Sequence, residues 1–211
     1  MPPVQELQTG LWHWTAPHPD WTAGDPENWG EEVSSYAIDD GDRLLLIDPL
    51  AVPKEIDELA ADRETVIVLT CPWHERDARS LVERLEVPVY VPPPEEFNDD
   101  VAWLRGDLER LEKEGYVFSA GDRLPVGIEA FPGKKICDLV LWVEGCRAVV
   151  VGDTLIDRGN GIEIPVDWLS EGVTRDQVVE KLRPLLELPV EFVLPTHGAP
   201  TDRVALERAL S

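Results

Sequence analysis

Residues 149–157 read VVVGDTLID, an apolar run that ends in Gly-Asp-Thr. A short run of β-branched residues closed by glycine is typical of a buried strand, so the sequence predicts Asp153 at the carboxyl end of such a strand. Loops at the carboxyl ends of strands are where proteins that mix strands and helices place reactive side chains. Asp153 is therefore the first candidate site residue.

Two further segments have the same design. LTCPWHERD at 69–77 ends an apolar strand with a polar loop that carries His74 and leads into an amphipathic helix. VLPTHGAP at 193–200 ends another apolar strand with a loop that carries His197. Both histidines also have an ordinary structural interpretation: His74 as a cap or packing residue at the start of a helix, and His197 as a hydrogen-bonded loop residue.

Two groups of strands, separated by helices, fill the rest of the chain. VSSYAI and RLLLIDPL are joined by DDGD, a turn sequence that predicts a hairpin. We expect an α/β fold in one domain, 1–211, with two mixed sheets packed face to face and helices on the outer faces. Strands are also predicted at TVIVLT, VPVYVPPP, YVFSAGDRL, GIEAFPG, DLVLWVEG and EFVLP, and helices near 53–61, 78–86, 95–114 and 176–186 and at the end of the chain.

The first thirty residues hold four of the eight tryptophans, in LWHWTAPHPDWTAGDPENWG. The stretch is too apolar for a disordered tail and too rich in Pro and Gly for a helix. We expect residues 1–30 to fold over the body as a loop that covers a cleft or a core edge. His18, between two prolines, is the histidine of this segment most suited to reach such a cleft.

The composition narrows the range of partners. Asp and Glu number 42 against 19 Lys and Arg, a formal net charge of -23, which repels nucleic acid and anionic membranes. No run of about 18 apolar residues is present, and the amino terminus has neither a basic nor an apolar leader region. We expect a cytoplasmic protein with a small-molecule substrate or ligand. Three cysteines without framework spacing fit reduced thiols there: Cys71, Cys137 and Cys146.

Taken in order, the three segments resemble the metallo-β-lactamase superfamily along nearly the whole chain. That family has a T-H-x-H-x-D-H loop, a strand ending in G-D-T whose Asp bridges two metals, and an L-P-x-H-G loop whose His binds the second metal. The hairpin strand LLLIDPL also resembles the family's early strand with its structural aspartate, here Asp48. The resemblance implies an αββα sandwich in which His74, Asp153 and His197 converge at one end of the two sheets.

The first loop departs from the family's ligand pattern. A slip of one residue places His74 on the second histidine position, Asp77 on the last and Arg76 on the aspartate position. We adopt this alignment because it keeps two residues able to bind a metal. Lys134, after Phe131-Pro132-Gly133, takes the place of the family's middle histidine. Aligned on Thr70 without the slip, the four ligand positions fall on Cys71, Trp73, Glu75 and Arg76.

These losses limit the metal chemistry. A protonated lysine and a guanidinium cannot bind a metal, so a two-metal site is not expected. The resemblance implies one ion at most, zinc or another divalent metal, on a mixed set of imidazoles and carboxylates. The predicted ligands are His74, Asp77, Asp153 and His197, and the predicted pocket residues are Lys134, Arg76, Cys71 and His18.

Two functional hypotheses follow. In the first, a metal-activated water attacks a small ester, thioester or lactone, and His74, Asp77 and Asp153 are the catalytic candidates. In the second, the protein binds no metal and holds a small anion or has a regulatory role, with the cationic pair Lys134 and Arg76 as its pocket. Ordinary alternatives remain for Asp153, as a carboxylate that ties down a loop, and for Cys71, as an inert buried thiol.

Overall fold

The computed structural model describes residues 3–24 and 28–211, and their first six strands form one mixed sheet. The hairpin predicted around DDGD is present, with Tyr36 opposite Ile47 on two antiparallel strands. The next two strands run parallel to the second strand of that hairpin. In spatial order the strands are β1 (Gln5–Gln8), β2 (Leu11–Pro17), β3 (Glu32–Asp39), β4 (Arg43–Ile47), β5 (Glu64–Val68) and β6 (Val89–Tyr90).

A second mixed sheet of six strands follows in the carboxyl-terminal half. Its strands pair antiparallel, except that β10 and β13 run parallel. In spatial order they are β14 (Thr201–Asp202), β13 (Phe192–Pro195), β10 (Ala148–Gly152), β9 (Leu139–Val143), β8 (Ile128–Pro132) and β7 (Arg123–Leu124). A separate two-stranded sheet consists of β11 (Ile156–Asp157) and β12 (Ile162–Glu163).

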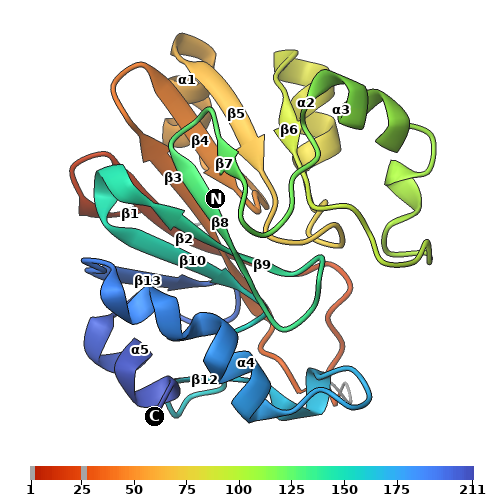
Figure 1. Cartoon of the computed structure of the whole chain (residues 1–211). Helices are drawn as coiled ribbons and strands as arrows, with labels where there is room; N and C mark the ends of the chain where they lie inside the picture. Colours follow the sequence, from red (N-terminus) through yellow and green to blue (C-terminus); the bar gives the residue numbers. More distant parts are fainter. Residues whose placement is uncertain (1–2, 25–27) are drawn as a thin grey trace.

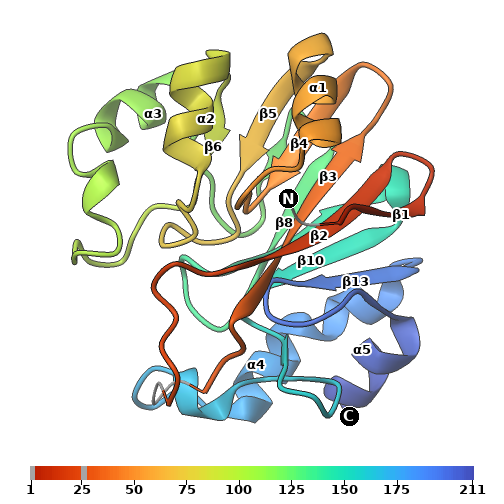
Figure 2. The same ribbon diagram turned by 180° about the vertical axis from the view of Figure 1, so that it is seen from behind.

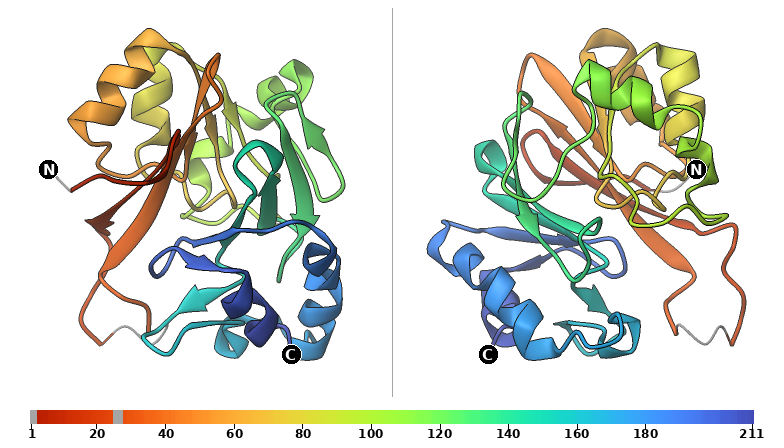
Figure 3. Two further views of the ribbon diagram at one scale, coloured as in Figure 1. Left: turned by 90° about the vertical axis from the view of Figure 1, so that its left-hand side faces the viewer. Right: turned by 45° about the vertical axis from the view of Figure 1, so that its right-hand side comes forward.

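Helices cover the outer face of each sheet, which gives the four layers predicted from the sequence (Figures 1 and 3). None of the helices in the described part of the chain has the length and apolar character needed to cross a bilayer. The first sheet carries α1 (Lys54–Asp62), α2 (Ala78–Leu85) and α3 (Leu108–Glu114), and the second carries α4 (Arg175–Leu182) and α5 (Arg203–Ala209). Short 3-10 helices are η1 (Ala102–Leu104), η2 (Glu144–Cys146), η3 (Val166–Trp168) and η4 (Arg183–Glu187).

The position of β10 between two apolar clusters explains why its sequence is apolar throughout. Val150 points into the cluster between the two sheets, whereas Val149 and Val151 point into the cluster under α4 and α5. Successive side chains of a strand face opposite sides, so a strand buried on both sides needs an unbroken apolar run. Full burial of each such valine stabilises the fold by about 1.5–3 kcal/mol.

Three expectations about local structure were wrong. The strand predicted over YVFSAGDRL is restricted to β7, because residues 119–122 form a turn. Residues 11–17 form the strand β2 and not a loop, because Leu11, Trp14 and Ala16 are buried while the chain pairs with β3. Only the part of this segment after Pro17 runs as a loop toward β3. The helix predicted over 95–114 is restricted to η1 and α3, since Gly106 and Asp107 break the pattern between them.

The parallel strand pairs β4/β5 and β10/β13 determine where the candidate site residues lie. The chain leaves β4 at Asp48 and β5 at Thr70, on one edge of the first sheet. It leaves β10 at Asp153 and β13 at Thr196, on one edge of the second. The two edges are joined by hydrogen bonds: the Leu139 amide donates to the Thr70 carbonyl at 2.9 Å, and the Ser34 amide donates to the Thr196 carbonyl at 2.8 Å.

His13 on β2 supports this junction through Ser34 and Tyr36. Its ring stacks on Tyr36, and its Nε2 lies 2.9 Å from the Ser34 hydroxyl, which itself donates to the Gly198 carbonyl at 2.7 Å. The single hydroxyl proton of Ser34 is therefore used in the bond to the Gly198 carbonyl. Nε2 of a neutral His13 must then donate to the Ser34 oxygen. Burial lowers the pKa of His13 to about 4.

The first prediction concerns Gly133, which follows β8. A Cβ here would lie 2.1 Å from the Asp138 carbonyl oxygen and 2.3 Å from the Thr154 hydroxyl oxygen. We expect Gly133→Ala to lower the free energy of unfolding by about 3 kcal/mol, at the upper end of overpacking penalties. Gly145→Ala, whose Cβ would meet nothing within 4 Å, is the matched control for denaturant unfolding. Equal midpoints for the two variants would contradict this packing.

The second prediction concerns pH. Because the pKa of His13 falls from 6.5 to about 4 on folding, its neutral form stabilises the protein above pH 6.5, and this contribution is lost as the pH falls toward 4. His13→Gln keeps a donor for Ser34 but cannot be protonated. The unfolding temperature of the wild type should therefore fall relative to that of His13→Gln between pH 6.5 and pH 4. A constant difference across this range would rule the effect out.

Candidate metal centre

His74 is held by a buried carboxylate. Asp48 follows β4, is fully buried, and accepts hydrogen bonds from the Thr70 amide at 2.9 Å and the Thr70 hydroxyl at 2.6 Å. Its Oδ2 also lies 3.1 Å from Nδ1 of His74. This contact fixes the imidazole and aims the other nitrogen, Nε2, at Asp153, whose Oδ1 is 3.3 Å away.

Asp153 is the point where the predicted residues meet. His197 Nε2 lies 3.3 Å from the same Oδ1 that faces His74, so two imidazoles converge on one oxygen. The other oxygen, Oδ2, accepts a hydrogen bond of 2.9 Å from the Trp73 indole. Cys71 joins the group, because its sulfur and one donor atom each of His74 and Asp153 lie within 4.8 Å of one another. The predicted convergence of these loops is confirmed.

The loop of His197 is shaped by a glycine. Gly198 has a φ of 123°, and a Cβ there would lie 2.6 Å from the Cβ of Asp157. The Asp157 amide donates to the His197 carbonyl at 2.8 Å, which fixes the loop against β11. Nδ1 of His197 is buried and has no hydrogen-bond partner. The ring is therefore positioned by its backbone and by Asp153.

The electrostatics of the group depend on Asp153. Burial disfavours the charge on His74, but the carboxylates of Asp153 and Asp48 outweigh it and raise the His74 pKa to about 9. Burial also disfavours the charge on Asp153, yet His74 and Lys134 hold its pKa well below the usual range. Burial lowers the pKa of His197. Without a metal, His74 is thus protonated and directs one N–H to each of two carboxylates, while His197 is neutral.

Lys134 lies inside the site. Its side chain is 3% exposed, and Nζ donates to the Asp153 carbonyl at 2.8 Å, with Oδ2 of Asp153 at 3.9 Å. The ammonium also lies 4.7 Å from the centre of the Trp168 ring. The resemblance placed Lys134 in the site beside Asp153, and these contacts agree with that expectation.

Asp138 was not identified from the sequence. It is fully buried, lies 3.4 Å from the Lys134 ammonium through Oδ2, and accepts a hydrogen bond of 3.1 Å from the Thr154 hydroxyl at the same oxygen. Burial raises the pKa of Asp138 to about 6, even though Lys134 opposes the shift. The signal in the sequence was an acid directly before the apolar strand LVLWV and four residues after Lys134.

Aromatic rings cover the group. Trp29 and Trp168 contact the His197 ring edge-on, with centroids 5.1 and 5.6 Å away, and both are only partly buried. Trp29 comes from the loop between β2 and β3 (Figure 2), and Trp168 comes from η3. His18 packs on Trp29 at 5.2 Å, and burial lowers the pKa of His18 to about 4. Within the described part of residues 18–31, Trp29 therefore packs on the His197 ring and His18 packs on Trp29.

Asp77 and Arg76 bond the backbone of neighbouring loops, although the charge of Arg76 still acts on His74, Asp153 and His197. The Asp77 carboxylate accepts a hydrogen bond from the Ala51 amide at 2.6 Å and makes no contact with Asp153, so its predicted role as a ligand finds no support in these contacts. Arg76 donates to the carbonyls of Asp48 at 2.7 Å and Ser34 at 2.9 Å, and so supports the loop of Asp48.

A turn in the first loop explains why Asp77 does not reach Asp153. The His74 amide donates to the Cys71 carbonyl at 3.2 Å, and this turn brings Cys71, Trp73 and His74 to Asp153 together. Neither alignment of this loop with the family pattern therefore holds throughout. Cys71 faces the site as in the alignment without the slip, and His74 faces it as in the alignment that we adopted.

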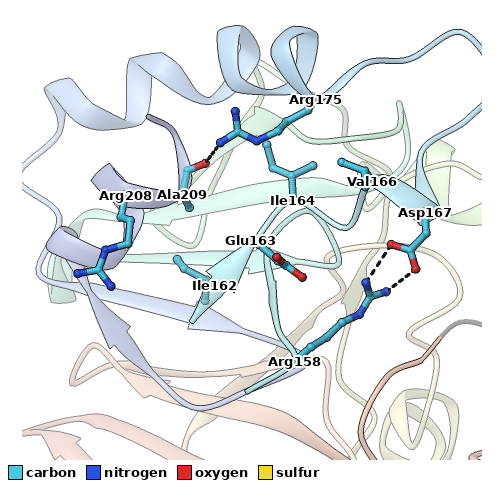
Figure 4. A pocket seen from close by; sticks show the side chains of 9 residues that line it. All are labelled: Arg158, Ile162, Glu163, Ile164, Val166, Asp167, Arg175, Arg208 and Ala209. Carbon is cyan, nitrogen blue, oxygen red and sulfur yellow. Dashed lines mark hydrogen bonds and ion pairs between the residues drawn. The ribbon is translucent and has the colours of Figure 1, made fainter. Parts of the chain in front are cut away.

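A separate cavity of about 290 Å³ lies beside β12 (Figure 4). Its wall includes Arg158, bound to Asp167 at 2.9 and 2.8 Å, and Arg175, which donates to the Ala209 carbonyl at 2.8 Å. None of the residues around Asp153 lines it.

Comparison with known proteins now identifies the fold. No protein-family model matches the sequence, and no curated protein matches it either. Among solved structures, the DIM-1 metallo-beta-lactamase exposed to ceftazidime is 15% identical with a TM-score of 0.67, over 99% of this chain and 94% of that chain. VMB-1 is 14% identical with a TM-score of 0.65, over 99% and 94%. A metallo beta lactamase from Hirschia baltica is 16% identical with a TM-score of 0.61, over 99% and 96%. The chain has the metallo-β-lactamase fold.

Proposed function

We propose that this protein is a hydrolase that holds one divalent metal ion on His74, Asp153 and His197, with the fourth position open to water. The observation that carries the proposal is the convergence of two imidazole nitrogens on Oδ1 of Asp153, each at 3.3 Å. Histidines that bind metals usually donate their other ring N–H to a carboxylate or a carbonyl. The Asp48 contact to Nδ1 of His74 has this form.

The donor set suits zinc. Imidazole nitrogen, carboxylate oxygen and thiolate sulfur are its usual protein ligands, and three protein ligands leave the fourth tetrahedral position for the water of a catalytic site. Burial raises the pKa of the Cys71 thiol well above its usual range, so the thiol is protonated in the free protein. A coordinated metal removes such a proton. Loss of that proton would make Cys71 a ligand in place of the water; the proposed catalytic form keeps the neutral thiol and the water.

The surroundings favour a small acyl substrate. An ion bound at this position would supply Lewis acidity and an activated water for attack on a carbonyl. The partly buried rings of Trp29, Trp73 and Trp168 exclude bulk water and offer apolar surface to an acyl group. We therefore propose a small ester, thioester or lactone as substrate.

The proposed setting is the cytoplasm. All three cysteines are free and buried in the structure, which fits a compartment that keeps thiols reduced. The net charge of -23 favours a small-molecule substrate over nucleic acid or a membrane surface.

The third prediction tests metal binding. Protein stripped with a chelator should bind about one equivalent of zinc in calorimetry, and His197→Ala should weaken binding by about 10-fold or more, because one ligand is lost. The zinc-loaded wild type should hydrolyse members of a panel of esters, thioesters and lactones, and His197→Ala should not. His13→Gln is the control, since His13 contacts Ser34 and Tyr36 and none of the proposed ligands. A wild type that binds no zinc would favour the metal-free alternative, with a small anion as the ligand.

The fourth prediction separates orientation from ligation. Asp48→Asn should weaken zinc binding by about 10–100-fold without removing a ligand, because the asparagine no longer fixes His74 as a carboxylate does. Asp77→Asn is the matched control: its side chain bonds the Ala51 amide, so zinc affinity should not change. Calorimetry on both variants decides the point. A larger effect of Asp77→Asn would restore Asp77 as a ligand and contradict the site described above.

A further inference from the structure

Lys134 is a second cation beside the proposed metal position. Its ammonium is buried, lies between Asp138 and Asp153, and is covered by the face of Trp168. The segment that carries it is rigid, because Gly133 is packed against the Asp138 carbonyl and the Thr154 hydroxyl. The Lys134 amide also donates to that hydroxyl at 3.0 Å. The side chain is therefore fixed in the site and does not extend toward solvent.

Lys134 contacts only one of the two carboxylate oxygens of Asp138. Oδ2 of Asp138 faces the ammonium and accepts from Thr154, but Oδ1 is buried and has no hydrogen-bond partner. The approach to Oδ1 is kept open by Gly152, where a Cβ would lie 2.8 Å from this oxygen. A buried carboxylate oxygen without a donor is costly. Such an oxygen is a ready ligand for a hard cation.

The charges explain why a lysine suits this place. Asp138 and Asp153 are both buried, and two such carboxylates need a compensating cation nearby. One ammonium supplies a single positive charge with three donors, which Asp153 and Asp138 share. A divalent ion at the same place would be repelled by the ammonium and would find its space taken.

We propose that Lys134 is a built-in substitute for a second divalent cation, and that Asp138 and Asp153 form the cation site that it fills. This inference rests on the proposed function, because it explains why the site holds one ion. It also assigns a role to Asp138, as the partner that fixes the ammonium. Removal of the lysine side chain should open a second divalent-cation site whose ligands include both carboxylates.

The fifth prediction compares zinc stoichiometry in wild type, Lys134→Ala and Lys134→Ala/Asp138→Asn, by calorimetry and by elemental analysis after gel filtration. Lys134→Ala should bind one equivalent more than the wild type, and the double variant should lose that extra equivalent. Asp138→Asn alone should keep the wild-type number, because Lys134 still occupies the position. Zinc should also raise the unfolding temperature of Lys134→Ala more than that of the wild type.

The design keeps the two proposals separate. The proposed function depends on the number of ions in the wild type, whereas this inference depends on the difference between wild type and variant. Zero ions in the wild type and one in Lys134→Ala would overturn the proposed function and support the inference. One ion in the wild type and one in Lys134→Ala would support the proposed function and overturn the inference.

The inference can also be tested if Lys134→Ala does not fold without metal. Lys134→Gln removes the charge but leaves an amide that can donate to Asp138, so it is the second test protein. Folding of either variant that depends on zinc and on Asp138 supports the inference. If both variants bind no more zinc than the wild type, folded or not, the inference is wrong.

Discussion

Asp153 is a carboxylate buried where the edges of two sheets meet, and most of the polar structure around it serves to accommodate its charge. His74 and His197 contact one of its oxygens, Trp73 donates to the other, and Lys134 lies beside it. A buried charge without such partners costs several kcal/mol. The loops that follow β5, β10 and β13 are therefore constrained jointly, although they are far apart in the sequence.

The same constraint gives the site its chemical character. His74 is held from behind by Asp48, which directs its free nitrogen toward Asp153. Lys134 places its amino group on the other side, within ion-pair distance of Asp138. One side of Asp153 thus presents donors that suit a metal, and the other side is closed by an ammonium. Under the proposed function, the site would hold one metal ion beside the fixed ammonium of Lys134.

The sequence predicted the fold well because the apolar runs that end in Asp153, His74 and His197 are long enough to define buried strands. It misplaced residues 11–17, since Pro and Trp obscured the strand pattern of β2. It also missed Asp138, because a single acid before a strand has no pattern of its own. The roles of Cys71 and Asp77 depended on a turn within one loop, and no residue pattern fixes such a turn.

The most direct test of one ion beside one fixed cation is a crystal structure of the zinc-loaded protein with anomalous data at the zinc edge. The account predicts a single peak bound by His74, Asp153 and His197, with nitrogen distances of about 2.0–2.1 Å, and the Lys134 ammonium still in contact with Asp138. Two peaks in the wild type, or one peak on Asp77 away from Asp153, would contradict it.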